Sequence, residues 1–66
     1  MDVTINGKPR TINDGGTVLD MLESLDVAPE GVIVEHNGRI LKRPLFNEAR
    51  VEAGDRLELI QIVGGG

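Results

Sequence analysis

The residues of the sequence best suited to a chemical reaction are the three consecutive glycines at its end. Gly64, Gly65 and Gly66 directly follow LELIQIV, a run of strand-forming residues. The carboxylate of a C-terminal residue is ionised at neutral pH, because its pKa lies at roughly 3.3–3.7. Such a carboxylate can attack an activated phosphate, and glycine places no side chain in the way of acyl transfer. The pattern therefore favours covalent chemistry at Gly66 in the active site of a second protein.

Residues 64–66 are predicted to form a flexible C-terminal tail on a folded domain of residues 1–63. Three glycines extended at roughly 3.3–3.6 Å per residue reach about 10 Å beyond the last strand. Because glycine lacks a Cβ atom, such a tail fits a narrow channel. The competing interpretations are a frayed terminus and a cloning remnant, since loose ends and glycine linkers are common.

The rest of the sequence offers little catalytic chemistry. It contains no cysteine and one histidine, His36, which argues against a thiolate or multi-histidine metal site. His36 is predicted to be an exposed residue beside a turn. No carboxylate pair or nucleophile–base combination has the setting that acid–base or covalent catalysis needs. We therefore expect a protein that is not itself an enzyme and that binds no metal or cofactor.

Length and charge restrict the function further. The 66 residues suit one small domain, and 7 basic against 11 acidic side chains give a net charge of -4. Nucleic-acid binding requires a basic surface, so we expect no nucleic-acid partner and instead a protein partner with a basic surface. No segment is apolar and long enough to span a bilayer, and the N-terminus does not resemble a signal peptide. We therefore expect no membrane association and a cytoplasmic location.

Two Asn-Gly turns predict two hairpins. Asn6-Gly7 lies in DVTINGKPRTIN and Asn37-Gly38 in VIVEHNGRILK, and apolar and polar residues alternate on both sides of each turn. Asn-Gly is the strongest short hairpin signal, because both positions tolerate a positive φ. Pro9 cannot donate a hydrogen bond to a neighbouring strand, so the strand that contains it is expected at a sheet edge.

A helix is predicted between the two hairpins. Thr17 is its expected N-cap, and Asp20 follows at the capping-box position. Helical spacing directs Val18, Leu22 and Leu25 towards the sheet. The APEG segment is expected to end the helix, because proline cannot continue it.

The last strand is predicted in RLELIQIV. Both of its faces are largely apolar, which favours a central position in the sheet. The simplest arrangement lays it parallel to the first strand, with the helix in the crossover. Before it, RPLFNEAR is expected to form a short helical turn in which Leu45 and Phe46 close the core. The predicted fold class is α+β: a β-grasp with a mixed four- or five-stranded sheet and one main helix across one face.

An apolar group is predicted on the sheet face away from the helix. Strand alternation places Ile60 and Ile62 on that face, with Ile33 on a neighbouring strand and with Glu58 and Glu35 beside them. Exposed apolar groups often mark partner sites. The alternatives are isolated surface isoleucines and a solvated charged face, which are ordinary. The candidate partner-binding residues are Ile33, Glu58, Ile60 and Ile62.

The whole length resembles the ThiS family, the sulfur carrier proteins of thiamine biosynthesis with a ubiquitin-like β-grasp fold. The resemblance is carried by INGK, TVLDMLESL, VIVEHNGRIL and EAGDRLELIQIVGGG, and the terminal Gly-Gly is its most specific element. It implies that a partner enzyme related to ubiquitin-activating enzymes adenylates the carboxylate of Gly66 with ATP. Sulfur then replaces AMP, which leaves a thiocarboxylate.

The same resemblance implies the other partners. Thiazole synthase would accept the sulfur, and a donor such as a cysteine desulfurase would supply it. Gly64 and Gly65 would enter the partner's active site. The rival interpretations are the sulfur-carrying small subunit of molybdopterin synthase, another ubiquitin-like carrier or modifier, and a β-grasp binding module that never uses its terminus.

Overall fold

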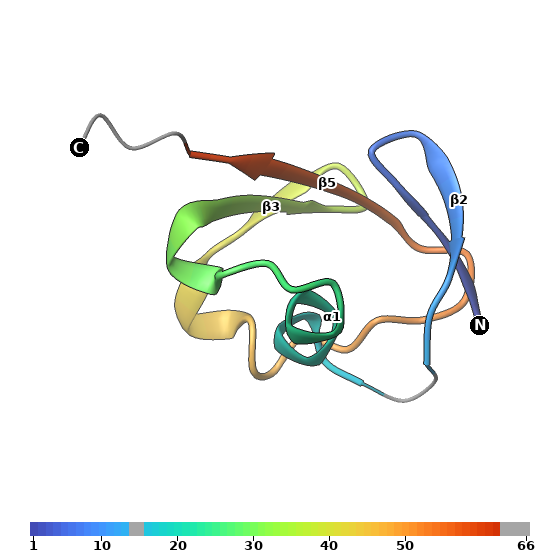
Figure 1. The fold of residues 1–66 in the computed structure, drawn as a ribbon, viewed down its shortest axis with the longest axis horizontal. Helices are drawn as coiled ribbons and strands as arrows, with labels where there is room; N and C mark the ends of the chain where they lie inside the picture. Colours follow the sequence, from blue (N-terminus) through green and yellow to red (C-terminus); the bar gives the residue numbers. More distant parts are fainter. Residues whose placement is uncertain (14–15, 63–66) are drawn as a thin grey trace.

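A computed structural model describes residues 1–13 and 16–62, arranged as one mixed sheet with a helix across one face (Figure 1). The strand order is β2-β1-β5-β3-β4. The strands are β1 (Asp2–Ile5), β2 (Lys8–Thr11), β3 (Val32–His36), β4 (Arg39–Leu41) and β5 (Arg56–Gln61). The helix is α1 (Val18–Ser24), and two 3₁₀ turns are η1 (Pro29–Gly31) and η2 (Arg43–Leu45). The predicted fold class is confirmed, with five strands.

Both hairpins form at the predicted Asn-Gly turns. The φ angles are 53° and 80° at residues 6–7, and 53° and 86° at residues 37–38. These left-handed conformations are the ones that asparagine and glycine adopt most readily. The first hairpin pairs β1 with β2, and β2, which contains Pro9, lies at the sheet edge as predicted.

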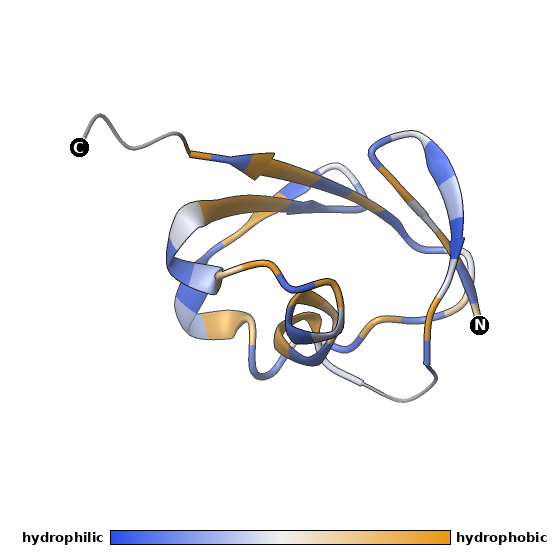
Figure 2. Ribbon diagram, in the orientation of Figure 1, coloured by the Kyte–Doolittle hydropathy of each residue, from blue (hydrophilic) through white to orange (hydrophobic). Residues whose placement is uncertain are grey.

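The last strand, β5, is central, also as predicted. It pairs parallel with β1 and antiparallel with β3. One face of the sheet packs against α1, and Figure 2 shows hydrophobic residues on both of these layers. Phe46 is buried and closes the core as predicted. Leu45 was also expected to close the core, but it is 45% exposed, so that part of the prediction is wrong. The buried core consists of Val3, Ile5, Val18, Met21, Leu22, Val32, Val34, Phe46, Val51 and Leu57.

The helix ends earlier than the sequence predicts. Its last residue is Ser24, well before the APEG segment. Asp26 has a φ of 60°, its N–H donates to the carbonyl of Glu23, and the N–H of Val27 donates to the carbonyl of Leu22 at 2.9 Å. This is the bonding pattern of a Schellman end, in which glycine is the usual left-handed residue. Because aspartate occupies that position here, the sequence gives no strong stop signal.

Candidate functional site

The predicted reactive tail, residues 64–66, lies outside the described residues, so the site is built from the end of β5. Ile62 is the last described residue. Its N–H donates to the carbonyl of Gly31 at 2.8 Å, which fixes the end of β5 to the turn that precedes β3. β5 pairs with β1 only at Arg56 and Leu57, whereas its pairing with β3 continues to Gln61, so the C-terminal end of β5 is held by β3 along one edge.

The outer face of the sheet, opposite α1, brings three of the predicted partner-binding residues together. Ile33 of β3 and Ile60 of β5 are direct cross-strand partners, and they are 39% and 49% exposed. Ile62 is 54% exposed and lines a groove with Ile33. Figure 2 shows hydrophobic colouring in the second half of β5, followed by a hydrophilic segment at its C-terminal end. The sheet therefore presents apolar side chains beside the start of the tail.

The register also places two carboxylates and a fourth isoleucine on this face. Glu58 lies directly opposite Glu35, and Glu35 in turn lies opposite Ile40 of β4. Ile40 is 70% exposed and is absent from the predicted partner-binding set. The two-residue turn at 37–38 fixes the hairpin register, so the position of Ile40 on this face could have been predicted from the sequence. We call Ile33, Ile40, Ile60 and Ile62 the isoleucine surface.

A groove of about 360 Å³ runs from the isoleucine surface around the end of the sheet. Ile33, Ile40 and Ile62 line it together with Val32 and Phe46 of the core. Its lining is mostly apolar, and three of its residues are exposed isoleucines rather than buried side chains. Apolar concave surfaces of this kind are where protein partners make contact.

The opposite end of β5 is polar. His36 Nε2 lies 2.7 Å from Asp55 Oδ2, the side chain of Asn37 donates to Asp55 Oδ1 at 3.1 Å, and the N–H of Glu52 donates to Asp55 Oδ2 at 2.9 Å. The predicted exposure of His36 is wrong: its side chain is 20% exposed. Partial burial raises the pKa of Asp55, but these hydrogen bonds outweigh it and hold that pKa below its usual value.

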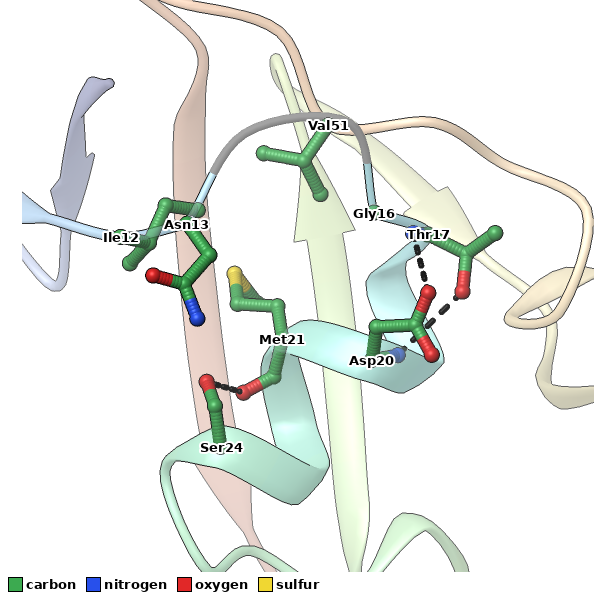
Figure 3. Close-up of a pocket in the computed structure, with 8 residues that line it drawn as sticks. All are labelled: Ile12, Asn13, Gly16, Thr17, Asp20, Met21, Ser24 and Val51. Carbon is green, nitrogen blue, oxygen red and sulfur yellow. Dashed lines mark hydrogen bonds between the residues drawn. The ribbon is translucent and has the colours of Figure 1, made fainter.

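A pocket of about 260 Å³ lies beside α1 and is shown in Figure 3. Of the four polar side chains that line it, those of Thr17, Asp20 and Ser24 are bonded within the fold, and Asn13 is the fourth. The N–H of Thr17 donates to Asp20 Oδ2 at 3.0 Å, the N–H of Asp20 donates to Thr17 Oγ1 at 3.2 Å, and Ser24 Oγ donates to the carbonyl of Met21. The first two bonds are the predicted capping box. These contacts make the pocket part of the helix start.

The described residues carry few other candidate sites. Within residues 1–13 and 16–62, no group of three or more His, Cys, Asp or Glu side chains is placed to hold a metal ion. In the same part of the chain, no helix has the length and apolar character to cross a membrane. The isoleucine surface and the end of β5 therefore remain the strongest candidate site.

Comparison with known proteins decides the family. Residues 3–66 match the ThiS family model. The chain belongs to the ThiS family. A ThiS-family relative, the sulfur carrier protein ThiS of Bacillus subtilis, is 35% identical over 63 residues, which cover 94% of this chain and 96% of that protein. The predicted resemblance is confirmed.

The ThiS fold is also confirmed by a solved structure. The crystal structure of the thiamine biosynthesis protein ThiS from Geobacter metallireducens has a TM-score of 0.85, with 40% sequence identity and full coverage of both chains. A thiazole synthase of Magnetococcus marinus is 32% identical over all 66 residues. This chain spans only 20% of the length of that enzyme, so the ThiS-like sequence forms a small part of it.

Proposed function

We propose that this chain is a sulfur carrier of thiamine biosynthesis and that it carries sulfur as a thiocarboxylate on Gly66. The observation that carries the proposal is the match to the ThiS family, which extends over residues 3–66 and so includes the final glycines. The central position of β5 supports it, because the strand that precedes the tail is part of the sheet. In this role the chain is a co-substrate and catalyses no step itself.

The chemistry proceeds in two substitutions. A carboxylate oxygen of Gly66 attacks the α-phosphorus of ATP, pyrophosphate leaves, and an acyl adenylate forms. A sulfur nucleophile then attacks the acyl carbon and AMP leaves with the bonding electron pair. With sulfide as the nucleophile, loss of its proton leaves the terminus directly as a thiocarboxylate. With a persulfide of the donor as the nucleophile, the product is an acyl disulfide, and a second thiol must attack the donor's sulfur. The S–S bond then breaks, the thiocarboxylate leaves with the electron pair, and the donor is left as a disulfide. ATP is bound by the activating enzyme, and glycine at 64–66 keeps the acyl carbon free of side-chain obstruction.

The outer face of the sheet and the glycine tail contact different parts of the adenylating enzyme. Ile33, Glu58, Ile60 and Ile62 contact the adenylating enzyme, while Gly64 and Gly65 pass into its active site. The exposed isoleucines support this role, since about half of the Ile60 and Ile62 side chains is accessible. Burial of such side chains at an interface is worth about 25 cal/mol per Å² of apolar area before the costs of association.

The proposed acceptor is thiazole synthase. Two thiazole synthases contain a segment similar to this whole chain, at 32% and 35% identity, which supports a carrier and an acceptor that act together. An adenylating enzyme related to ubiquitin-activating enzymes and a sulfur donor such as a cysteine desulfurase complete the proposed set. These reactions belong to the cytoplasm, where ATP is available.

The test is the intact mass of the protein after incubation with ATP, a sulfide source and the adenylating enzyme of the same organism. We expect a mass gain equal to the replacement of one oxygen by one sulfur. A variant with one extra residue after Gly66 should gain nothing, whereas a matched variant with the extra residue before Met1 should react like the original chain. A mass gain in the C-terminally extended variant, or none in the original chain, would refute the proposal.

A further inference from the structure

The pairing of Glu35 with Glu58 is unfavourable within the chain itself. The two residues are direct partners across β3 and β5 on the outer face. Side chains in such pairs have Cβ atoms about 4.5–5.5 Å apart, and like charges directly opposite each other destabilise a sheet. Both residues are partly buried, so solvent screens their repulsion less than it would screen fully exposed charges.

No internal contact compensates this repulsion. Within residues 1–13 and 16–62, neither carboxylate makes a hydrogen bond or an ion pair. The contrast with Asp55 is direct, because three donors surround that carboxylate. Glu35 and Glu58 thus lie directly opposite each other without an ion-pair partner in the described part of the fold.

The surroundings of the pair are apolar. Ile40 lies beside Glu35 on β4, and the next rung of the ladder on the same face is the pair Ile33 and Ile60. When a partner covers these isoleucines, water is removed from the carboxylates as well. Buried charges need an opposite charge and hydrogen bonds, since an unpaired charge is costly away from water. A partner that covers the isoleucine surface must therefore bring a cation to this position.

We propose that Glu35 and Glu58 together form the receptor for an arginine of the adenylating enzyme, within the apolar contact made by the isoleucine surface. Arginine fits better than lysine, because its planar guanidinium has five donors and can bridge two carboxylates, and because it is weakly hydrated and tolerates apolar neighbours. The inference rests on the proposed function, since it names the chemistry by which the same partner is recognised.

The test compares the double variant Glu35→Gln/Glu58→Gln with Glu23→Gln, an exposed carboxylate on α1. The adenylating enzyme of the same organism is the probe, and affinity is measured by calorimetry without ATP. We expect the double variant to bind roughly tenfold more weakly and Glu23→Gln to bind like the original chain. The thermal midpoint of the double variant should rise by about 1–5 °C, because the cross-strand repulsion is removed.

Each outcome decides the inference. Unchanged affinity of the double variant overturns it. A loss of binding free energy in Glu23→Gln of half that size or more also overturns it, because Glu23→Gln removes one charge where the double variant removes two, and such a loss would indicate an effect of net charge alone. A midpoint that does not rise overturns it too, because the carboxylates would then be accommodated inside the fold.

Charge-dependent binding without adenylation of Gly66 would refute the carrier function and leave this inference standing. Adenylation with equal affinity in all variants would support the carrier function and refute the arginine receptor. If the original chain does not bind the enzyme at all, both the carrier function and the arginine receptor are refuted.

Discussion

The two ends of β5 differ in the contacts that their side chains make within the fold. At the N-terminal end, Asp55 accepts hydrogen bonds from Asn37 and Glu52 and lies 2.7 Å from His36. At the C-terminal end, Ile60 and Ile62 leave about half of their side-chain area exposed. One strand thus begins in a bonded polar network and ends in an unburied apolar surface.

Because of this difference, we expect the polar end of β5 to determine stability and the apolar end to determine partner binding. Hydrogen bonds that are made inside the fold contribute to the free energy of unfolding. Exposed apolar area contributes nothing to folding and becomes favourable only when a partner covers it. Changes at the polar end should therefore alter stability, and changes at the apolar end or beyond it should alter partner binding and activation.

The largest expected effect is at the tail. Deletion of Gly65 and Gly66 should abolish adenylation, because the acyl carbon no longer reaches the active site of the partner. The free energy of unfolding should stay within about 0.5 kcal/mol, since every core residue of the described chain lies between Val3 and Leu57. Pyrophosphate release and a thermal melt measure the two quantities. Retained adenylation would remove the proposed role of the tail.

The next largest effect is expected on the isoleucine surface. Ile60→Asn should weaken binding of the adenylating enzyme by about 2 kcal/mol, or roughly 30-fold, as is typical of a central interface residue. Its effect on stability should be under about 1 kcal/mol, because the side chain is half exposed. Gln61→Asn is the control, since residue 61 is its exposed neighbour on β5. Equal binding of both variants would show that the apolar end is not an interface.

Much of this arrangement could be predicted from the sequence, because the signals are local. The Asn-Gly turns set both hairpins, Pro9 placed β2 at an edge, and Thr17 marked the helix start. The alternation of residues in β5 also separated its core face from its outer face. These features depend on backbone conformation and strand period, which neighbouring residues determine.

The three errors have different physical causes. His36 is partly buried because Asp55, 19 residues later, reaches it across the start of β5. The helix ends at Ser24 because Asp26 adopts a left-handed conformation that glycine usually supplies. Ile40 joins the outer face only through its pairing with Glu35. Of these three, only the strand pairing followed from a signal already recognised in the sequence.

At the polar end, Asp55→Ala should reduce stability. The substitution removes an acceptor from the Asn37 side chain, from the N–H of Glu52 and from His36. Hydrogen bonds to charged groups are worth about 1.5–3 kcal/mol, so we expect a loss of about 2 kcal/mol and a midpoint lower by roughly 10 °C. Glu48→Ala, an exposed carboxylate, is the control in urea unfolding. Equal stability of the two variants would show that the Asp55 network does not stabilise the fold.

The smallest expected effect is on the pH dependence of stability. The pKa of Asp55 is lower in the folded protein than its usual value, which is about 3.9 in an unfolded chain. The stability that Asp55 contributes is therefore complete above the unfolded pKa and is lost as the pH falls through the folded pKa.

Asp55→Asn tests this sign, because it removes the titrating group while keeping a similar shape. Urea unfolding at pH 6 and at pH 3 should show the original chain losing more free energy of unfolding than this variant between the two conditions. Binding of the adenylating enzyme at pH 7 should be the same for both proteins, because the network lies at the opposite end of β5 from the isoleucine surface. Weaker binding by Asp55→Asn would mean that the two ends are coupled through β5, and that stability and recognition are not separated along this strand.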